Sequence, residues 1–364
     1  MIVLAFTVSA CGDQPGPAST PTTSPKTASE SGQWHVESAG QLGQIEAETC
    51  ATEQFCIVVD RAGYVVSRDG RVTWQRGSFA SDTTLFSAGA VSCPSLTTCL
   101  VVGTAGRTVQ PAVAVSTDGA NSWHLQQFES LGSSLNAVTC ASESLCMTAG
   151  SAINAHRKSL VYVTRDGGTD WQSVVLDQNI DIHGITCWTT LLCSAVGYTI
   201  RDGTTALVAL LNTTDGGLHW MSKTVSTPAG IGGLSCVSTG RCMSVGLSTS
   251  DIITTEPVVF VQEDYNHAFT RTVNALGVAS LDDVSCGTPL FCVAVGWGWT
   301  GSGQNRTHRA IVLATDDGGT SWHRESGPAN VTEVLNVSCR ATLHCLAGAI
   351  TDPYGYVVLS REVS

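Results

Sequence analysis

The stretch Leu281–Trp322 reads LDDVSC, GTPLF and CVAVG, then a variable loop, then AIVLATDDGGTSW. It predicts a short strand that ends at Cys286, a five-residue turn and a strand that begins at Cys292. After the loop, a second apolar strand leads into a tight turn closed by Trp322. Most of the chain repeats this pattern, so the stretch decides the fold.

The cysteines set the register of the repeat. Seven pairs are separated by five residues each, and successive pairs lie 43 to 53 residues apart. This period is close to the length of a four-stranded propeller blade. The pairs are Cys50/Cys56, Cys93/Cys99, Cys140/Cys146, Cys187/Cys193, Cys236/Cys242, Cys286/Cys292 and Cys339/Cys345. We therefore expect an all-β, seven-bladed β-propeller with one Cys-x5-Cys hairpin in each blade.

A second motif follows most of the cysteine pairs. It has the form S/T-x-D-x-G-x-x-W and occupies Ser67–Trp74, Ser116–Trp123, Thr164–Trp171, Thr213–Trp220 and Thr315–Trp322. It resembles the Asp-box, or bacterial neuraminidase repeat, of β-propellers such as sialidases, sortilin-type receptor domains and photosystem II assembly factors. The resemblance extends over about 330 of the 364 residues. It implies a propeller fold, but one fold hosts many activities.

By this resemblance the box is a structural turn between the third and fourth strands of a blade. Its Asp and Ser/Thr side chains accept hydrogen bonds from backbone N–H groups, and its Trp packs between blades. Gly168, Gly217 and Gly319 supply a positive φ. Arg71 and Ala120 occupy this glycine position in blades 1 and 2, so we expect distorted turns there. Blade 5 departs from the motif with Gln262, Asp264, Asn266 and Phe269.

The last repeat is incomplete, because Gly355–Glu362 has no box tryptophan after it. A matching tryptophan, Trp34, lies near the other end of the sequence. We expect the N-terminal segment to supply the outer strand of blade 7 and close the ring, which removes exposed sheet edges. The propeller is therefore expected to span residues 34–364.

The N-terminal segment predicts export. Residues 1–10 are apolar, and Val8-Ser9-Ala10-Cys11 resembles a bacterial lipobox. This implies a signal peptide over residues 1–10 and a lipidated Cys11 at the outer face of a bacterial membrane. The alternative is a soluble secreted protein with an ordinary cleavage site. The basic n-region of a signal peptide is missing, so we expect the start codon upstream.

The count of cysteines agrees with this interpretation, because Cys11 is the one left over after seven pairs among fifteen. Residues 11–33 are rich in Ser, Thr, Pro and Gly and predict a disordered tether. The paired cysteines are expected to form disulfides in an oxidising compartment, each contributing about 2 kcal/mol. Zinc binding is the alternative, but metal sites prefer Cys-x2-4-Cys spacing. No metal or cofactor is expected.

Candidate binding residues lie in the loops between the second and third strands of each blade (the B–C loops), which vary most between repeats. The formal net charge of −12 argues against nucleic acid as a partner. The blade 6 loop combines aromatic, amide and basic residues suited to a sugar or a protein. These candidates are Trp297, Trp299, Asn305, Arg306, His308 and Arg309, with Arg157, Lys158 and Arg201 in other loops. Alternatively, the two tryptophans cap the central channel.

The function expected from these features is a non-catalytic, monomeric module that binds a protein or glycan of the cell envelope. The alternative is an exo-glycosidase resembling sialidases. The Arg-Ile-Pro motif of sialidases is absent, and none of the six tyrosines is tied by spacing to a set of arginines. Glycoside hydrolysis needs two nearby carboxylates, and Asp202 and Asp251 lie in candidate loops.

Overall fold

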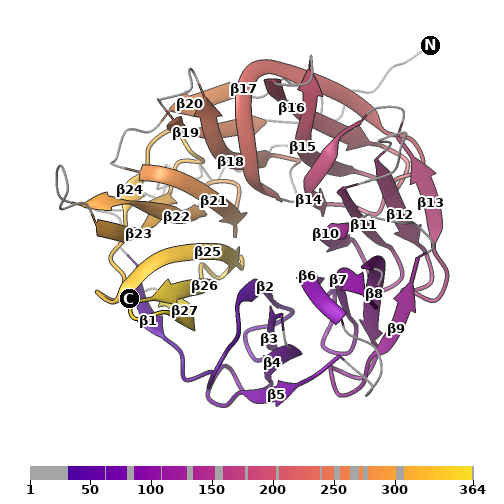
Figure 1. The fold of residues 1–364 in the computed structure, drawn as a ribbon, viewed down its shortest axis with the longest axis horizontal. Coiled ribbons are helices and arrows are strands. Elements are labelled where there is room, and N and C mark those ends of the chain that lie inside the picture. The colour runs from indigo at the N-terminus through magenta and orange to yellow at the C-terminus, as the bar shows by residue number, and fades with distance from the viewer. Residues whose placement is uncertain are drawn as a thin grey trace, which may run out of the picture. The chain divides into compact units, whose positions relative to one another are not determined.

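The computed structural model describes residues 32–61, 63–79, 86–107, 109–128, 134–151, 159–176, 179–201, 205–237, 240–249, 255–262, 270–273, 278–300 and 307–362. Strands and turns account for all of these residues. Seven blades of antiparallel strands stand around a central axis (Figure 1). The predicted all-β, seven-bladed propeller is confirmed. The predicted signal peptide, Cys11 and nearly all of the tether lie outside the described residues.

Each of the first three blades is a separate four-stranded sheet. Blade 1 contains β2 (Ile45–Cys50), β3 (Cys56–Asp60), β4 (Gly63–Ser67) and β5 (Gln75–Gly77). Blade 2 contains β6 (Phe86–Ser92), β7 (Cys99–Ala105), β8 (Gln110–Ser116) and β9 (His124–Gln127). Blade 3 contains β10 (Ser134–Cys140), β11 (Cys146–Ser151), β12 (Leu160–Thr164) and β13 (Gln172–Val175).

Blades 4 and 5 share one long strand, β17 (Met221–Cys236), which leaves blade 4 as its outer strand and enters blade 5 as its inner strand. Blade 4 also contains β14 (Asp181–Cys187), β15 (Cys193–Arg201) and β16 (Thr205–Thr213). Blade 5 also contains β18 (Cys242–Thr249), β19 (Thr255–Gln262) and β20 (Thr270–Val273). Blade 6 contains β21 (Val278–Cys286), β22 (Cys292–Thr300), β23 (Thr307–Thr315) and β24 (His323–Arg324). Blade 7 contains β25 (Val331–Cys339), β26 (Cys345–Thr351), β27 (Gly355–Glu362) and β1 (Gln33–Val36).

The cysteine pairs form seven disulfides, one in each blade, as predicted. In every blade but blade 2, the two cysteines are directly opposite in the register of the inner strand and the next strand, as for Cys286 and Cys292. Their Cα atoms lie 4.0 Å apart in blade 6. Each bridge therefore closes the turn at the end of the innermost hairpin.

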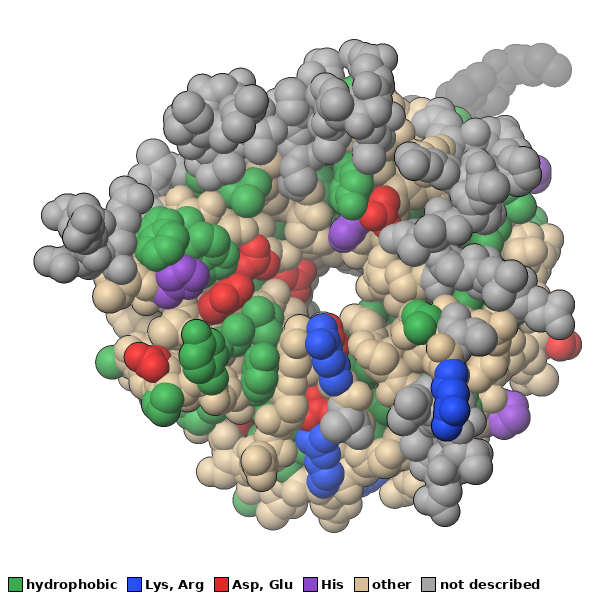
Figure 2. Space-filling model, viewed as in Figure 1, with side chains coloured by type: hydrophobic (Ala, Val, Ile, Leu, Met, Phe, Trp, Pro, Cys, Tyr) green, Lys and Arg blue, Asp and Glu red, His purple; other side chains and the backbone are tan. Residues whose placement is uncertain are grey.

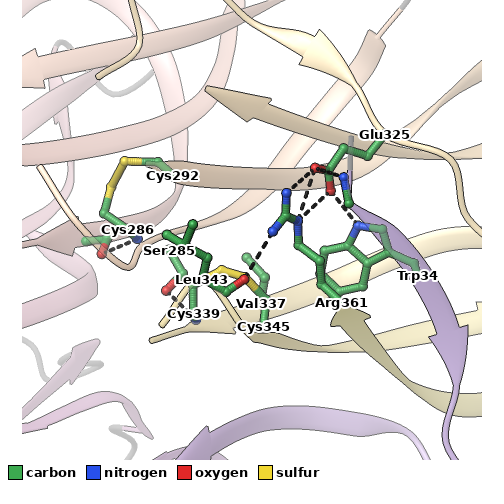
Figure 3. Close-up of a disulfide and its surroundings, with 12 residues drawn as sticks. Trp34, Ser285, Cys286, Cys292, Glu325, Val337, Cys339, Leu343, Cys345 and Arg361 are labelled. Carbon is green, nitrogen blue, oxygen red and sulfur yellow. Dashed lines mark hydrogen bonds and ion pairs between the residues drawn. A yellow bond between two sulfur atoms is a disulfide. The ribbon is translucent and has the colours of Figure 1, made fainter. Parts of the chain in front are cut away.

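The ring closes in blade 7, where the N-terminal strand β1 pairs with the C-terminal strand β27. Trp34 lies opposite Arg361 in this register, and it is buried. Glu325, at the end of blade 6, accepts hydrogen bonds from the Trp34 indole at 2.8 Å and the Gly32 amide at 3.0 Å. It also pairs with the Arg361 guanidinium at 2.6 Å (Figure 3). The predicted closure is confirmed, and this buried network fastens it to blade 6.

The hydrophobic core is divided among the spaces between neighbouring blades. Seven clusters of buried residues are found in the described chain, and each combines side chains from two adjacent blades. Because every blade is covered on both faces, the central strands are apolar without alternation. Ile57, Val58 and Val59 are all at most 1% exposed. A propeller core of this kind requires the ring to be closed, since an end blade would leave one apolar face in water.

The turns of the S/T-x-D-x-G-x-x-W motif, called the box turns below, have the expected hydrogen bonds. In blade 6, the Thr315 hydroxyl accepts a hydrogen bond from the Gly319 amide at 2.8 Å, and Asp317 accepts one from the Ser321 amide at 2.9 Å. Gly319 has φ +90°. The Trp123 ring lies 5.4 Å from the Tyr64 ring of blade 1, so this tryptophan packs between blades.

The expectation of distorted turns in blades 1 and 2 is wrong. Arg71 and Ala120 adopt φ +73° and +62°, the left-handed conformation that glycine has in the other boxes. Their amides donate to the Ser67 and Ser116 hydroxyls at 2.8 and 2.9 Å. The hydrogen bonds of the turn hold the backbone in this conformation despite the side chain. The departures from the motif in blade 5 lie outside the described residues, apart from Gln262.

Candidate functional site

The two faces of the ring carry different kinds of turn. The disulfide turns and the box turns share one face, and the Gly318 amide of a box turn donates to the Leu290 carbonyl of the disulfide turn in the same blade at 2.8 Å. The hairpin between β22 and β23 leaves blade 6 at the opposite end. We call this opposite side of the ring the B–C face.

An aromatic cluster lies on the blade 6 hairpin of the B–C face. It consists of Trp297 and Trp299 on β22 and His308 on β23. The Trp297 and His308 rings are stacked with centroids 4.6 Å apart and planes 3° apart. The Trp299 ring meets the His308 ring edge-on at 4.4 Å, and Trp299 remains 42% exposed. Trp299 and His308 are opposite in the strand register, so the pleat directs these side chains to one face of the hairpin.

The other sequence candidates do not join this cluster. Arg309 is exposed and pairs with Gly298, one position out of register, so its side chain projects from the other face of the hairpin. Arg201 ends β15 in blade 4, on a different hairpin. Asn305, Arg306, Arg157 and Lys158 lie outside the described residues, as do Asp202 and Asp251. Neither Trp297 nor Trp299 is among the residues that line the central channel.

A pocket of about 480 Å³ lies beside the aromatic cluster, between blades 6 and 7. His308 and Thr307 form part of its wall on β23, and Thr332 lines it from β25. Its floor includes Val312 and Val334, which belong to the core between the two blades. The pocket is thus continuous with the aromatic cluster through His308.

Four carboxyl groups form a second feature, which we call the acidic strip: Glu48 on β2, Asp282 and Asp283 on β21, and Glu333 on β25. Glu48, Asp282 and Asp283 line the central channel. All three strands run toward the disulfide face and end at the first cysteine of their blade. Glu333 is six residues before Cys339, whereas Glu48 is two residues before Cys50. Glu48 is therefore deepest in the channel and Glu333 is nearest the B–C face. Figure 2 shows acidic side chains beside the central opening, next to hydrophobic side chains and a histidine.

Burial raises the pKa values of all four carboxyls in the strip. The pKa of Asp283 rises to about 7 even though its oxygens accept hydrogen bonds from the Val284 and Val337 amides at 2.8 and 2.9 Å. Burial, and then the negative charge of Asp283, hold the pKa of Glu48 well above its ordinary value. Burial and Asp282 raise the pKa of Glu333, and His308 partly offsets this rise. His308 and Thr332, the neighbour of Glu333 in β25, line the same pocket, so the strip and the aromatic cluster lie close together.

The interpretation of the sequence missed the acidic strip, although the repeats carry a signal for it. The residue three positions before the first cysteine is Ala or Gly in blades 1 to 5, but Asp283 in blade 6. The residue two positions before it is Val, Ile or Leu in blades 2 to 7, but Glu48 in blade 1. Small residues on the neighbouring blade make room, because a Cβ on Gly233 would lie 2.1 Å from an Asp283 oxygen. Comparison of equivalent positions would have found both residues.

A third group of polar side chains occupies blade 4. His183 stacks on Tyr198 with ring centroids 5.1 Å apart and lies 3.5 Å from Asp181. A hydrogen bond to Asp181 raises the pKa of Tyr198. A raised pKa disfavours the phenolate form that a sialidase-like nucleophile requires.

Comparisons with known proteins support the fold alone. The sequence matches no family model and no curated protein. The structure is similar to that of YCF48 bound to D1 peptide, with a TM-score of 0.62 and 15% identity over 91% of this chain and 97% of that chain. It is similar to a GH74 xyloglucanase from Xanthomonas campestris, with a TM-score of 0.61 and 12% identity over 90% of this chain and 53% of that chain. It is also similar to a chain of the Mitotic Checkpoint Complex, with a TM-score of 0.59 and 9% identity over 98% of both chains.

These similar structures include an enzyme and proteins found with a peptide or in a protein complex, so the fold does not decide between catalysis and binding. Within the described residues, no group of three or more His, Cys, Asp or Glu side chains is arranged to hold a metal ion. The described part of the chain also has no helix that is long and apolar enough to cross a membrane.

Proposed function

We propose that this chain is an exported, membrane-tethered and non-catalytic module that binds a protein partner through the B–C face of blade 6. The observation that carries the proposal is the aromatic cluster, in which Trp299 stays 42% exposed on a regular hairpin. Exposed tryptophans held on rigid elements are typical anchors of protein interfaces. The propeller of YCF48, which has a similar fold, was found with a bound peptide.

The proposed location comes from the sequence. Residues 1–10, Cys11 and the tether to residue 33 would hold the ring at the outer face of a bacterial membrane. Mass spectrometry of the membrane fraction is expected to find a diacylglyceryl group on Cys11 at the mature N-terminus. An unmodified mature terminus at another residue would exclude the anchor and leave the secreted alternative.

The binding site is tested by crosslinking and pull-down from intact cells with the full chain. Trp299→Ala removes the exposed ring of the aromatic cluster. Leu290→Ala is the matched control, because Leu290 is 56% exposed in the disulfide turn of the same blade, on the opposite face. We expect a protein that the wild type and Leu290→Ala capture and that Trp299→Ala loses. Equal capture by all three proteins would refute this site, and capture of a glycan alone would favour a lectin.

The second candidate is a glycoside hydrolase of the sialidase-like kind. The observation in its favour is that carboxyls with raised pKa values, which suit a general acid, lie on the strands beside the exposed Trp299, which could stack on a sugar. A panel of fluorogenic glycosides tests it. Turnover that disappears in Asp283→Asn or Glu333→Gln would establish an enzyme and overturn the non-catalytic proposal.

A further inference from the structure

The carboxyls of the acidic strip have no counter-ion among the described residues. None of the four forms an ion pair with a described Lys, Arg or His, whereas Glu46 pairs with Arg61 at 2.8 Å nearby. Buried oxygens of Glu48 and Asp282 have no hydrogen-bond partner, and Glu48 is only 7% exposed. An unpaired buried carboxylate is costly, so a cation that reached the strip would be strongly favoured.

The aromatic cluster supplies the second half of a cation site. The face of an aromatic ring attracts an ammonium or guanidinium group that lies within about 6 Å of its centroid. Trp299 and His308 lie at the B–C end of blade 6, and His308 lines the same pocket as Thr332, which is next to Glu333 in β25. Trp297 lies opposite Ser280 in the strand register, and the Ser280 hydroxyl donates to Asp282. Aromatic rings and carboxyls therefore border the same small area of the B–C face.

We infer that the partner presents a Lys or Arg side chain, which lies against Trp299 and His308 and reaches the carboxyls of Glu333 and Asp282. This inference rests on the proposed function and adds the chemistry of the ligand. Charge complementarity selects a basic segment of a protein over a neutral sugar or an acidic ligand. Arg309 lines the neighbouring pocket, but it is one position out of register with His308 and forms no ion pair with the described carboxyls of the strip.

Short peptides of defined charge test the inference on the full chain. The probes are acetylated, amidated tetralysine, tetraglutamine and tetraglutamate, and binding is measured by isothermal titration at low salt. We expect tetralysine to bind and the other two not to bind. Glu333→Gln keeps the size of the side chain and should weaken tetralysine binding about tenfold, which is about 1.4 kcal/mol. Glu46→Gln is the matched control, because Glu46 lines the central channel near Glu48 but is already paired with Arg61.

The inference is overturned if tetraglutamine binds as tightly as tetralysine, or if Glu333→Gln and Glu46→Gln have the same effect. The pull-down separates this failure from failure of the proposed function. A partner that Trp299→Ala loses but Glu333→Gln captures like the wild type would leave the binding module standing and refute the basic side chain. A partner that both variants capture normally would refute both.

Discussion

Two sets of carboxyl groups show how differently the two faces of this propeller are built. On the disulfide face, the box carboxyls have lowered pKa values because they accept hydrogen bonds from the hydroxyls and amides of their own turns. These are Asp69, Asp118, Asp166, Asp215 and Asp317. In the channel and toward the B–C face, burial raises the pKa values of the acidic strip.

The difference separates structural carboxyls from those available to a ligand. A box carboxyl is satisfied within one blade and recurs from blade to blade, so it serves the fold. The strip carboxyls lie on three different blades and have no ion pair with a described Lys, Arg or His. Burying these unpaired carboxyls destabilises the folded protein, and a cation supplied by an external partner would reduce that destabilisation.

The largest loss of stability is expected on removing a buried carboxyl that has both hydrogen-bond donors and a counter-ion. Glu325→Ala removes the acceptor of Trp34, Gly32 and Arg361 and leaves the Arg361 guanidinium buried without a counter-ion. We expect the free energy of unfolding to fall by about 3–5 kcal/mol, measured by urea denaturation. The control is Arg61→Ala. Arg61 pairs with Glu46 and its side chain is 62% exposed, so this change should lower the free energy of unfolding by less than about 1 kcal/mol. Equal losses would contradict the role of Glu325 in closing the ring.

A smaller effect is expected for one disulfide. Replacing Cys286 and Cys292 by Ala opens a loop of the same length as in every other blade. We expect the free energy of unfolding to fall by about 2 kcal/mol. The same change at Cys140 and Cys146 should give a similar loss, since the loops are equal in length. Urea denaturation of both variants measures this. A large difference between blades would show that the repeated face is not energetically uniform.

Asp118→Ala tests a satisfied carboxyl of the box and should destabilise the protein by about 1 kcal/mol, as for a lost capping side chain. Hydrogen bonds from Ser122, Ser116 and Asn121 lower the pKa of Asp118 to about 2. Because this folded-state pKa is below the unfolded value, the contribution is complete above about pH 4 and is lost as pH falls toward 2. Thermal unfolding at pH 7 and pH 2.5 should show a larger difference between wild type and variant at pH 7 than at pH 2.5.

The smallest effect has the opposite sign. Glu48→Gln removes a carboxyl whose folded-state pKa is raised, so the folded protein binds more protons than the unfolded chain from about pH 4 up to that raised pKa. Stability of the wild type therefore falls as pH rises through this window, and the variant avoids the loss. We expect a melting temperature higher by about 2 °C at pH 8, with no difference below pH 4. A lower melting temperature at pH 8 would mean that Glu48 is satisfied after all.

Much of the fold could be predicted because each blade is a local structure repeated along the chain. The spacing of Cys286 and Cys292 fixes a hairpin, and the box from Thr315 to Trp322 fixes the turn that follows. The closure of blade 7 also followed from the sequence, since Trp34 was the missing box tryptophan. The turns at Arg71 and Ala120 were mispredicted because the hydrogen bonds of the turn outweigh the preference of a side chain for negative φ.

The candidate site was predicted only in part. The sequence located Trp297, Trp299 and His308 on one hairpin, but proximity in sequence alone did not separate them from Arg309, which the pleat directs to the other face. The acidic strip joins Glu48 to Asp283 and Glu333 across more than 280 residues of chain. No local pattern connects such positions.

By itself, the sequence determined the number of blades, the disulfides, the box turns and the closure of the ring, because these depend on contacts within a repeat or on the count of repeats. Only the tertiary structure decided which carboxyls are satisfied and which are not. Burial, and the supply of hydrogen-bond donors and counter-ions, come from neighbouring blades whose arrangement exists only once the ring has closed.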